Sequence, residues 1–301
     1  MKRFKPHRTV LYFGLRILEK LLNIFSYDTG FKIAQTLGLW SYFCAPLERK
    51  RTLENLNSVF GSDKSQDEIR RIAKEVFVNF GRSLYELLAS KKIVADWDRF
   101  VSAEGLEHLD KALAKKKGAV IVAGHIGNWE LLAGYLARQG YPCTVVARRV
   151  YFEKYNAWMV NLRNKMKVDT IYRDAPVRDV LSALRLNRLV GFVADQDTDG
   201  IDGIFVQFFG RSAWTPTAPV RFARVGEAPM LPVFIVRKGM HHTVTVGPEL
   251  ELNLSRDKEE ELKINTQKWV TLQEAFIRKF PEQWVWNHRR WRTTSPDLKS
   301  S

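Results

Sequence analysis

The chain has 301 residues, 45% hydrophobic and 27% charged, so it can bury a sizeable core, and an intrinsically disordered chain is excluded. Its 48 basic side chains outnumber 33 acidic ones, which gives a formal net charge of +15. This excess indicates an acidic partner: nucleic acid, an anionic membrane surface or an acidic protein. Nucleic acid is the weakest of these, because many of the 9 Trp, 9 Tyr and 18 Phe residues lie in apolar segments rather than between basic residues.

Residues 1 to about 95 are predicted to be helical. Within them, residues 10–25 follow a basic leader and place their polar side chains on one stripe, formed by Arg16, Glu19, Lys20 and Asn23. Such an amphipathic helix either lies in a membrane interface or docks on the core of its own protein, and the pattern fits both. No uncharged apolar run reaches the ~18 residues of a transmembrane helix. The clearest helix is 65–89, which begins with a capping box of Ser65 and Glu68.

From about residue 101 onward, short β-rich runs alternate with helical ones. Strands are predicted at 119–123, 143–147, 168–171, 189–194, 231–237 and 241–246. Helices are predicted at 130–138, 153–166, 176–187, 217–225 and 257–280, and a glycine- and aspartate-rich loop at 195–211. This alternation predicts an α/β fold with a mostly parallel central sheet flanked by helices and closed by an antiparallel pair that turns at Lys238-Gly239. We expect a helical segment, 1–95, and an α/β domain, 96–301, in one continuous fold.

One histidine stands where an α/β sheet places its ligand sites. His125 follows the predicted strand 119–123 directly, at the carboxyl end, and Gly124 and Gly127 on either side allow a sharp turn and close approach of a substrate. Four residues separate His125 from Glu130, so one helical turn would return the carboxylate of Glu130 to the imidazole. A carboxylate on one ring nitrogen fixes the tautomer and leaves the other nitrogen free to take a proton. We therefore predict a general-base pair of His125 and Glu130. A structural histidine remains the alternative, and a metal site ranks lower because no second His or Cys is at ligand spacing.

Further polar side chains follow other predicted strands. Arg148 and Arg149 come after strand 143–147 and suit phosphate groups, because guanidinium forks bind phosphate bidentately. Arg163 belongs to the same basic stretch. Asp195 and Asp197 follow strand 189–194, and we favour arginine pairing or backbone capping over metal binding for them. The apolar run 204–209 either lines an acyl-chain groove or belongs to the core.

Several motifs in this order resemble the bacterial lipid A biosynthesis acyltransferases, the lauroyl- and myristoyltransferase family, within the wider His-x4-Asp/Glu glycerolipid acyltransferases. The resemblance rests on four segments that span most of the chain. They are Arg51-Thr-Leu-Glu-Asn-Leu56 with Val59-Phe60-Gly61, His125-Ile-Gly-Asn-Trp-Glu130, Asp195-Gln-Asp197 with Gly203-Ile-Phe-Val-Gln-Phe-Phe-Gly210, and Pro281-Glu-Gln-Trp-Val-Trp-Asn-His-Arg-Arg-Trp291.

The resemblance implies a fold of the glycerolipid-acyltransferase type with membrane-associated N-terminal helices. It implies transfer of an acyl chain from acyl carrier protein, an acidic donor, to a hydroxyl of an anionic lipid A precursor at the cytoplasmic face of the bacterial inner membrane. Transfer of an acyl group from a thioester to a hydroxyl needs neither a cofactor nor a metal. We expect His125 and Glu130 to be catalytic and six residues to bind substrate: Asn128, Arg148, Arg149, Arg163, Asp195 and Asp197.

Three other interpretations stay open. The same chemistry on another acceptor, such as a lysophospholipid, an aminolipid or a glycolipid of the phosphatidylinositol mannoside type, fits the His125 box equally well. A non-catalytic basic protein that binds membrane or nucleic acid fits the charge but not the intact His-Glu box. A metal-dependent hydrolase built on His125, Asp195 and Asp197 comes third.

Overall fold

The computed structural model describes residues 6–198 and 200–294. Its helices are α1 (Pro6–Ile24), α2 (Tyr27–Cys44), α3 (Pro46–Phe60), α4 (Gln66–Leu88), α5 (Ser90–Ala95), α6 (Trp97–Phe100), α7 (Leu106–Ala114), α8 (Trp129–Arg138), α9 (Glu153–Lys165), α10 (Val177–Arg185), α11 (Ala218–Gly226), α12 (Lys258–Lys279) and the 3-10 turn η1 (Pro281–Gln283). Its strands are β1 (Val101–Glu104), β2 (Ala119–Ala123), β3 (Cys143–Ala147), β4 (Asp169–Tyr172), β5 (Leu189–Val193), β6 (Gly203–Phe208), β7 (Arg211–Pro216), β8 (Met230–Lys238) and β9 (His241–Val246). The predicted helical N-terminal region and the alternation that follows it are confirmed for these residues.

The central sheet has seven strands within the described ranges, in the order β1-β9-β8-β2-β5-β3-β4. Only β8 and β9 pair antiparallel, and every other neighbouring pair in this sheet is parallel. The mostly parallel sheet is therefore confirmed. Strands β2, β5 and β3 lie side by side and point the same way, so the segments that follow them meet at one edge. Those segments carry His125, Asp195 and Arg148.

Two parts of the sheet differ from the prediction. The antiparallel pair does not close the sheet, because β1, a four-residue strand that the pattern did not reveal, adds to β9 as a parallel edge. The predicted loop 195–211 contains β6, which forms a separate hairpin with β7. The hairpin turns at Phe209 and Gly210, both with positive φ (52° and 70°). A turn of that kind normally carries Asn, Asp or Gly at its first position. Because Phe209 occupies that position, the sequence did not indicate the turn.

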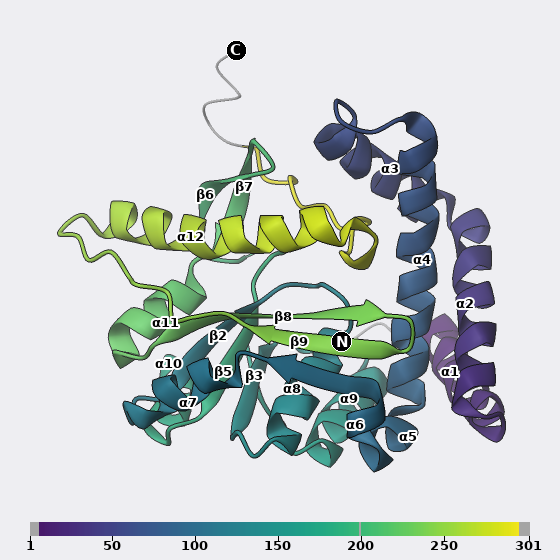
Figure 1. The fold of residues 1–301 in the computed structure, drawn as a ribbon, viewed down its shortest axis with the longest axis horizontal. Helices are drawn as coiled ribbons and strands as arrows, with labels where there is room; N and C mark the ends of the chain where they lie inside the picture. Colours follow the sequence, from purple (N-terminus) through teal and green to yellow (C-terminus); the bar gives the residue numbers. More distant parts are fainter. Residues whose placement is uncertain (1–5, 199, 295–301) are drawn as a thin grey trace.

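The apolar run 204–209 lies in the core. Ile204, Val206 and Phe208 of β6 are buried, as is Phe209 at the turn, and they belong to the hydrophobic cluster on one face of the sheet. This face is covered by α10, α11 and α12, and the other by α7, α8 and α9 (Figure 1). All five residues of β2 are buried, as expected for a strand covered on both faces.

The long helix α4 connects the N-terminal helices to the sheet. Ser65 and Glu68 cap its first turn reciprocally, which confirms the predicted capping box. The helix stands beside the hairpin end of β8 and β9, with α1 and α2 on its outer side (Figure 1). Among the described residues, none of the helices combines the length and the apolarity needed to cross a membrane. The division at residue 95 stays a prediction.

Candidate active site

His125 and Asp195 meet at the carboxyl edge of the sheet. Their strands, β2 and β5, are paired with Ala123 opposite Val193, so the two side chains leave the sheet at the same level. The Nδ1 atom of His125 contacts Oδ1 of Asp195, and the backbone N–H of His125 donates to Oδ2 at 2.8 Å. Gly124 leaves room for this arrangement, because a Cβ at this position would lie 2.2 Å from the side-chain amide of Gln273.

Asp195 is buried and held by four donors. Besides the two groups of His125, the amide of Gln273 (2.6 Å) and the indole N–H of Trp284 (2.8 Å) both donate to Oδ2. Burial alone would raise the pKa of this carboxyl, but the adjacent His125 and the donated hydrogen bonds outweigh burial and hold it below its ordinary value. Asp195 is therefore an ionised anchor that fixes the orientation of the His125 ring.

The opposite side of the His125 ring faces a large cavity. The side chain is 18% exposed and lines a cavity of about 1040 Å³, and its Nε2 atom has no hydrogen-bond partner in the described parts of the chain. Trp129 packs edge-on against the ring at 4.7 Å between centroids. An imidazole oriented by a carboxylate on Nδ1 and open at Nε2 is equipped to accept a proton from a bound hydroxyl.

Glu130 does not contact His125 in the way the sequence suggested. Both of its carboxylate oxygens accept hydrogen bonds from Arg163, at 2.8 Å from Nε and 2.6 Å from Nη2. The predicted geometry assumed a helix from His125 onward, whereas α8 begins only at Trp129 and Gly127 has a φ of +59°. The residue that pairs with His125 is Asp195, which the sequence analysis placed among substrate-binding residues. Glu130 and Arg163 instead form an ion pair on the cavity wall.

The other predicted binding residues take different places. Arg148 lines the large cavity. Arg149 stacks on Tyr172, with the guanidinium carbon 3.8 Å from the ring centroid. Asp197 is buried and accepts from the backbone N–H and hydroxyl of Thr293, at 2.7 and 2.9 Å, so capping describes it better than substrate contact. Among the described residues no group of three His, Cys, Asp or Glu side chains is placed to hold a metal ion, and activity without metal remains a prediction.

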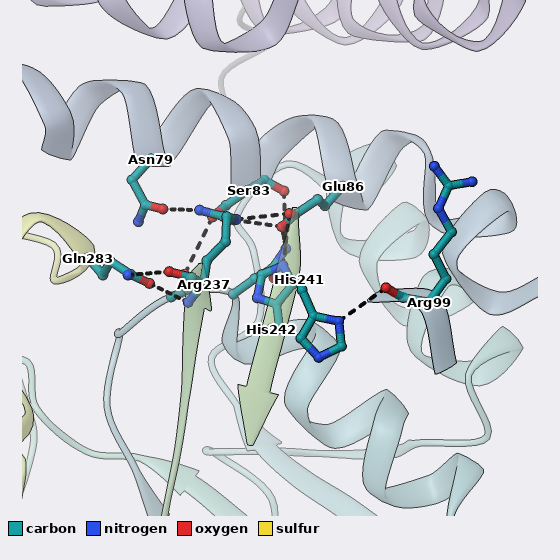
Figure 2. A network of polar contacts seen from close by, with 10 residues as sticks. Asn79, Ser83, Glu86, Arg99, Arg237, His241, His242 and Gln283 are labelled. Atoms are coloured by element: carbon teal, nitrogen blue, oxygen red, sulfur yellow. Dashed lines mark hydrogen bonds and ion pairs between the residues drawn. The ribbon is translucent and has the colours of Figure 1, made fainter. Parts of the chain in front are cut away.

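Asn128 points away from the cavity, into a buried polar network. Its amide donates to Glu86 at 2.8 Å, and Glu86 also accepts from Arg237 and His242 (Figure 2). We correct its predicted substrate-binding role accordingly: Asn128 is 2% exposed and fixes the backbone beside His125.

Two residues of the site escaped the sequence analysis. Gln273 comes from α12 and lies 78 positions from Asp195, and Trp284 comes from the tryptophan-rich segment and lies 89 positions away. Nothing in local spacing links them to His125. The one available signal was that the tryptophan-rich segment formed part of the family resemblance.

Comparison with known proteins identifies a family for the chain. The family model described as bacterial lipid A biosynthesis acyltransferase matches residues 1–293. A phosphatidylinositol mannoside acyltransferase of Mycobacterium tuberculosis strain H37Rv is 27% identical over 80% of this chain and 75% of its own length. A lipid A biosynthesis acyltransferase of Haemophilus influenzae is 25% identical over 94% and 87%, and the lipid A biosynthesis lauroyltransferase of Escherichia coli K12 is 24% identical over 98% and 95%. The chain is thus an acyltransferase and belongs to the bacterial lipid A biosynthesis acyltransferase family.

Proposed function

We propose that the protein transfers a fatty acyl chain from acyl carrier protein to a hydroxyl of a lipid A precursor, with His125 as general base and Asp195 as its partner. The observation that carries the proposal is the orientation of His125. Asp195 holds Nδ1, while Nε2 is open to a cavity of about 1040 Å³, at the top of the range for ligand pockets.

In the proposed reaction, Nε2 of His125 takes the proton of the acceptor hydroxyl while its oxygen forms a bond to the thioester carbonyl carbon. The carbon–sulfur bond then breaks, and the departing sulfur takes the proton back from His125. The products are an ester and a free thiol, so the imidazole ends neutral. No acyl-enzyme is needed, in keeping with the absence of Ser and Cys among the described residues that line the cavity.

The cavity offers apolar and polar walls suited to such substrates. Val180, Phe192 and Phe222 contribute apolar surface on which an acyl chain can pack. Glu130 and Arg163 contribute a paired charge near the histidine. We assign Glu130 the role of positioning Arg163, whose guanidinium is then available to a polar group of the substrate.

A second acceptor class deserves the same test. The similarity to the mycobacterial phosphatidylinositol mannoside acyltransferase favours a mannosylated glycolipid as the alternative to a lipid A precursor. Either acceptor carries anionic phosphate, which suits the positive charge of the chain.

The test combines an acceptor panel with one substitution. Purified protein is given acyl carrier protein thioester and either a phosphorylated glucosamine lipid or a phosphatidylinositol mannoside, and products are identified by mass spectrometry. His125→Ala should fold and lose about 10²-fold or more of the rate. Near wild-type turnover by this variant would disprove the mechanism, and no transfer to either lipid would disprove the proposed acceptors.

We also propose attachment to the cytoplasmic face of the inner membrane through α1 and α2. Leu22 of α1 packs on the protein, but a set of large apolar side chains is more than half exposed on these helices: Val10, Leu11, Phe13, Ile17, Leu21, Ile24, Trp40 and Phe43. An apolar helical surface with flanking cations binds anionic bilayers. Deleting residues 1–26 should reduce co-flotation with anionic vesicles. Undiminished flotation of a folded variant would refute a role for α1.

A further inference from the structure

A second, smaller cavity of about 300 Å³ adjoins the active-site cavity, and Arg148 and Thr198 line both. Segments from distant parts of the chain surround it. Arg51 comes from α3, Arg148 follows β3, and Arg289 and Arg292 belong to the segment after η1. Four guanidinium groups thus gather around a space next to the site that holds His125.

Three of the four arginines of this cavity, Arg51, Arg148 and Arg289, have no carboxylate partner among the described residues. Its lining contains one carboxylate, Asp197, which already accepts two hydrogen bonds from Thr293 and lies 3.6 Å from Arg292. Arg51, Arg148 and Arg289 make no hydrogen bond or ion pair with the described residues. Other arginines of the protein differ from these three because each has a carboxylate oxygen within 3 Å. Examples are Arg163, Arg188 and Arg237.

Histidine adds no positive charge to this cavity at neutral pH. His288 also lines it, and burial lowers its pKa to about 4, so the ring is neutral. The cations are therefore the arginines alone. Like charges this close repel one another and favour a bound anion.

Specific contacts of neighbouring residues hold together the two backbone segments that carry Arg51 and Arg289. Asn55 lies one helical turn after Arg51 on α3, and its amide donates to the carbonyl oxygens of Trp286 (2.7 Å) and His288 (3.0 Å). Arg290, which is buried, donates to the Trp214 carbonyl at 2.6 Å. These bonds hold α3 and the C-terminal segment together, so Arg51 and Arg289 line the same cavity although they are far apart in sequence.

We infer that this cavity binds a phosphate group of one of the two substrates that meet at His125. The inference rests on the proposed function and names a site for it. Planar guanidinium groups donate pairs of hydrogen bonds to phosphate oxygens, and several of them around one space suit the anionic oxygens of a phosphate monoester or a phosphodiester. Because the two cavities share lining residues, one substrate molecule can place its phosphate in the small cavity and its reacting group beside His125.

Two substrates carry suitable phosphate chemistry. The lipid acceptor bears it on its headgroup, and the donor bears it as the phosphodiester of the carrier protein's pantetheine arm. The site chemistry is the same for both, so the experiment must separate them.

The first experiment measures binding without turnover. Inorganic phosphate is titrated at low salt onto the full chain, onto Arg51→Gln and onto Arg289→Gln, and binding is followed by calorimetry. We expect each variant to lose about 10–100-fold in affinity, as for a lost hydrogen bond to a charged group. Because neither arginine is paired within the described chain, both variants should be at least as stable as the wild type when phosphate is absent.

Arg138→Gln is the matched control. It removes the same charge at the far end of α8, about 15 Å along the helix from its start beside His125, and should bind phosphate like the wild type. No measurable phosphate binding by the wild type, or an equal loss in Arg138→Gln, would overturn the inference. This result is independent of catalysis, so it stays distinguishable from a failure of the proposed function.

The second experiment finds the source of the phosphate. If the cavity binds the phosphate of the acceptor, Arg51→Gln should raise the KM for the phosphorylated acceptor. The KM for the dephosphorylated acceptor should stay unchanged. A donor site predicts a raised KM for acyl carrier protein thioester and an unchanged KM for an acyl-pantetheine thioester without phosphate. Wild-type KM values for both natural substrates would refute the site.

Discussion

Among the described residues, His125 and His242 each contact a buried carboxylate, and we propose only His125 as a catalytic base. His125 contacts Asp195 at the edge of a large cavity, with 18% of its side chain exposed. His242 of β9 donates to Glu86 of α4 at 2.8 Å, with 1% of its side chain exposed. A histidine paired with a carboxylate is therefore a candidate general base at His125 and a part of the buried core at His242. The difference lies in what the second ring nitrogen meets, an open cavity or a closed core.

The carboxylates differ in a similar way. Asp195 serves one histidine, and its remaining donors, Gln273 and Trp284, are neutral. Glu86 is the centre of a network in which Arg237 supplies the opposite charge, with Asn79, Ser83 and Gln283 as further partners of that arginine (Figure 2). Burial opposes ionisation of Glu86, yet Arg237 and His242 lower its pKa below the ordinary value. One carboxylate orients a base and the other compensates a buried cation.

The two regions are connected through the loop that carries His125. Gly127 donates its N–H to the carbonyl of Gln283 at 2.9 Å, and Asn128 donates to Glu86. Gln283 in turn exchanges two hydrogen bonds with the backbone of Arg237. The buried network therefore supports the loop that carries His125, and its members do not line the cavity.

The largest expected effect comes from removing the partner of the base. Asp195→Asn keeps the shape of the side chain but loses its charge and favours the wrong tautomer of His125, so kcat should fall about 10²–10⁴-fold. Steady-state kinetics on protein shown to be folded by circular dichroism would measure it. If Asp195→Asn kept most of its activity while Glu130→Gln lost it, Glu130 would be the partner after all.

Removing Glu86 should act on stability instead. Glu86→Gln leaves Arg237 buried without a counter-charge, which costs about 3–5 kcal/mol of the free energy of unfolding. Adding Arg237→Met removes that cation and should restore much of the loss. Denaturant titration would measure both variants. A stable Glu86→Gln protein, or a double variant that is weaker still, would contradict this account of the network.

The next prediction concerns a third carboxylate, Glu130. A double-mutant cycle can show whether its contribution to activity depends on Arg163 or on His125. Because Glu130 binds Arg163 bidentately, substitutions at these two positions should couple by about 0.5–3 kcal/mol in a double-mutant cycle on kcat/KM. The pairs to compare are Glu130→Gln with Arg163→Gln, and Glu130→Gln with His125→Ala. Stronger coupling to His125 than to Arg163 would restore the dyad expected from the sequence.

Much of the sheet was predictable because its central strands are short β-rich runs that alternate with helical segments along the chain. Strands 119–123 and 143–147 were predicted at their observed bounds. The hairpin of β6 and β7 was missed because Phe209 adopts a positive φ that its sequence does not suggest. That conformation is supported from outside the hairpin, by a hydrogen bond from its N–H to Glu274 and by ring contacts with Phe60 and Trp286.

The site was only partly predictable for a related reason. His125 was found because its strand and glycines are local features, and Asp195 because it also follows a strand. Their contact depends on β5 lying next to β2, a pairing set by the order of strands in the sheet rather than by spacing along the chain. The same holds for Arg51 and Arg289, which lie far apart in sequence and line one cavity.

The smallest expected effect is a change in how stability depends on pH. Burial lowers the pKa of His242 from its ordinary 6.5, against the opposing effect of Glu86, so the folded protein holds this ring neutral more firmly than the unfolded chain does. Protonation then favours unfolding: the contribution is complete above about pH 6.5 and is lost as the pH falls below it. Glu86 acts at lower pH, because its pKa is depressed from 4.5 and its stabilisation is lost only below that value.

His242→Gln should therefore reduce the fall in Tm between about pH 7 and pH 5 and leave the fall below about pH 4.5 in place. The amide keeps a donor for Glu86 but cannot be protonated in this range. His288, whose pKa is lowered to about 4 by burial, contributes to the same fall in both proteins and cancels in the difference. Since His242 does not reach the cavity, kcat near neutral pH should stay close to wild type. Equal Tm profiles would show that His242 does not limit stability in acid, and a large loss of kcat would place the buried histidine in catalysis beside His125.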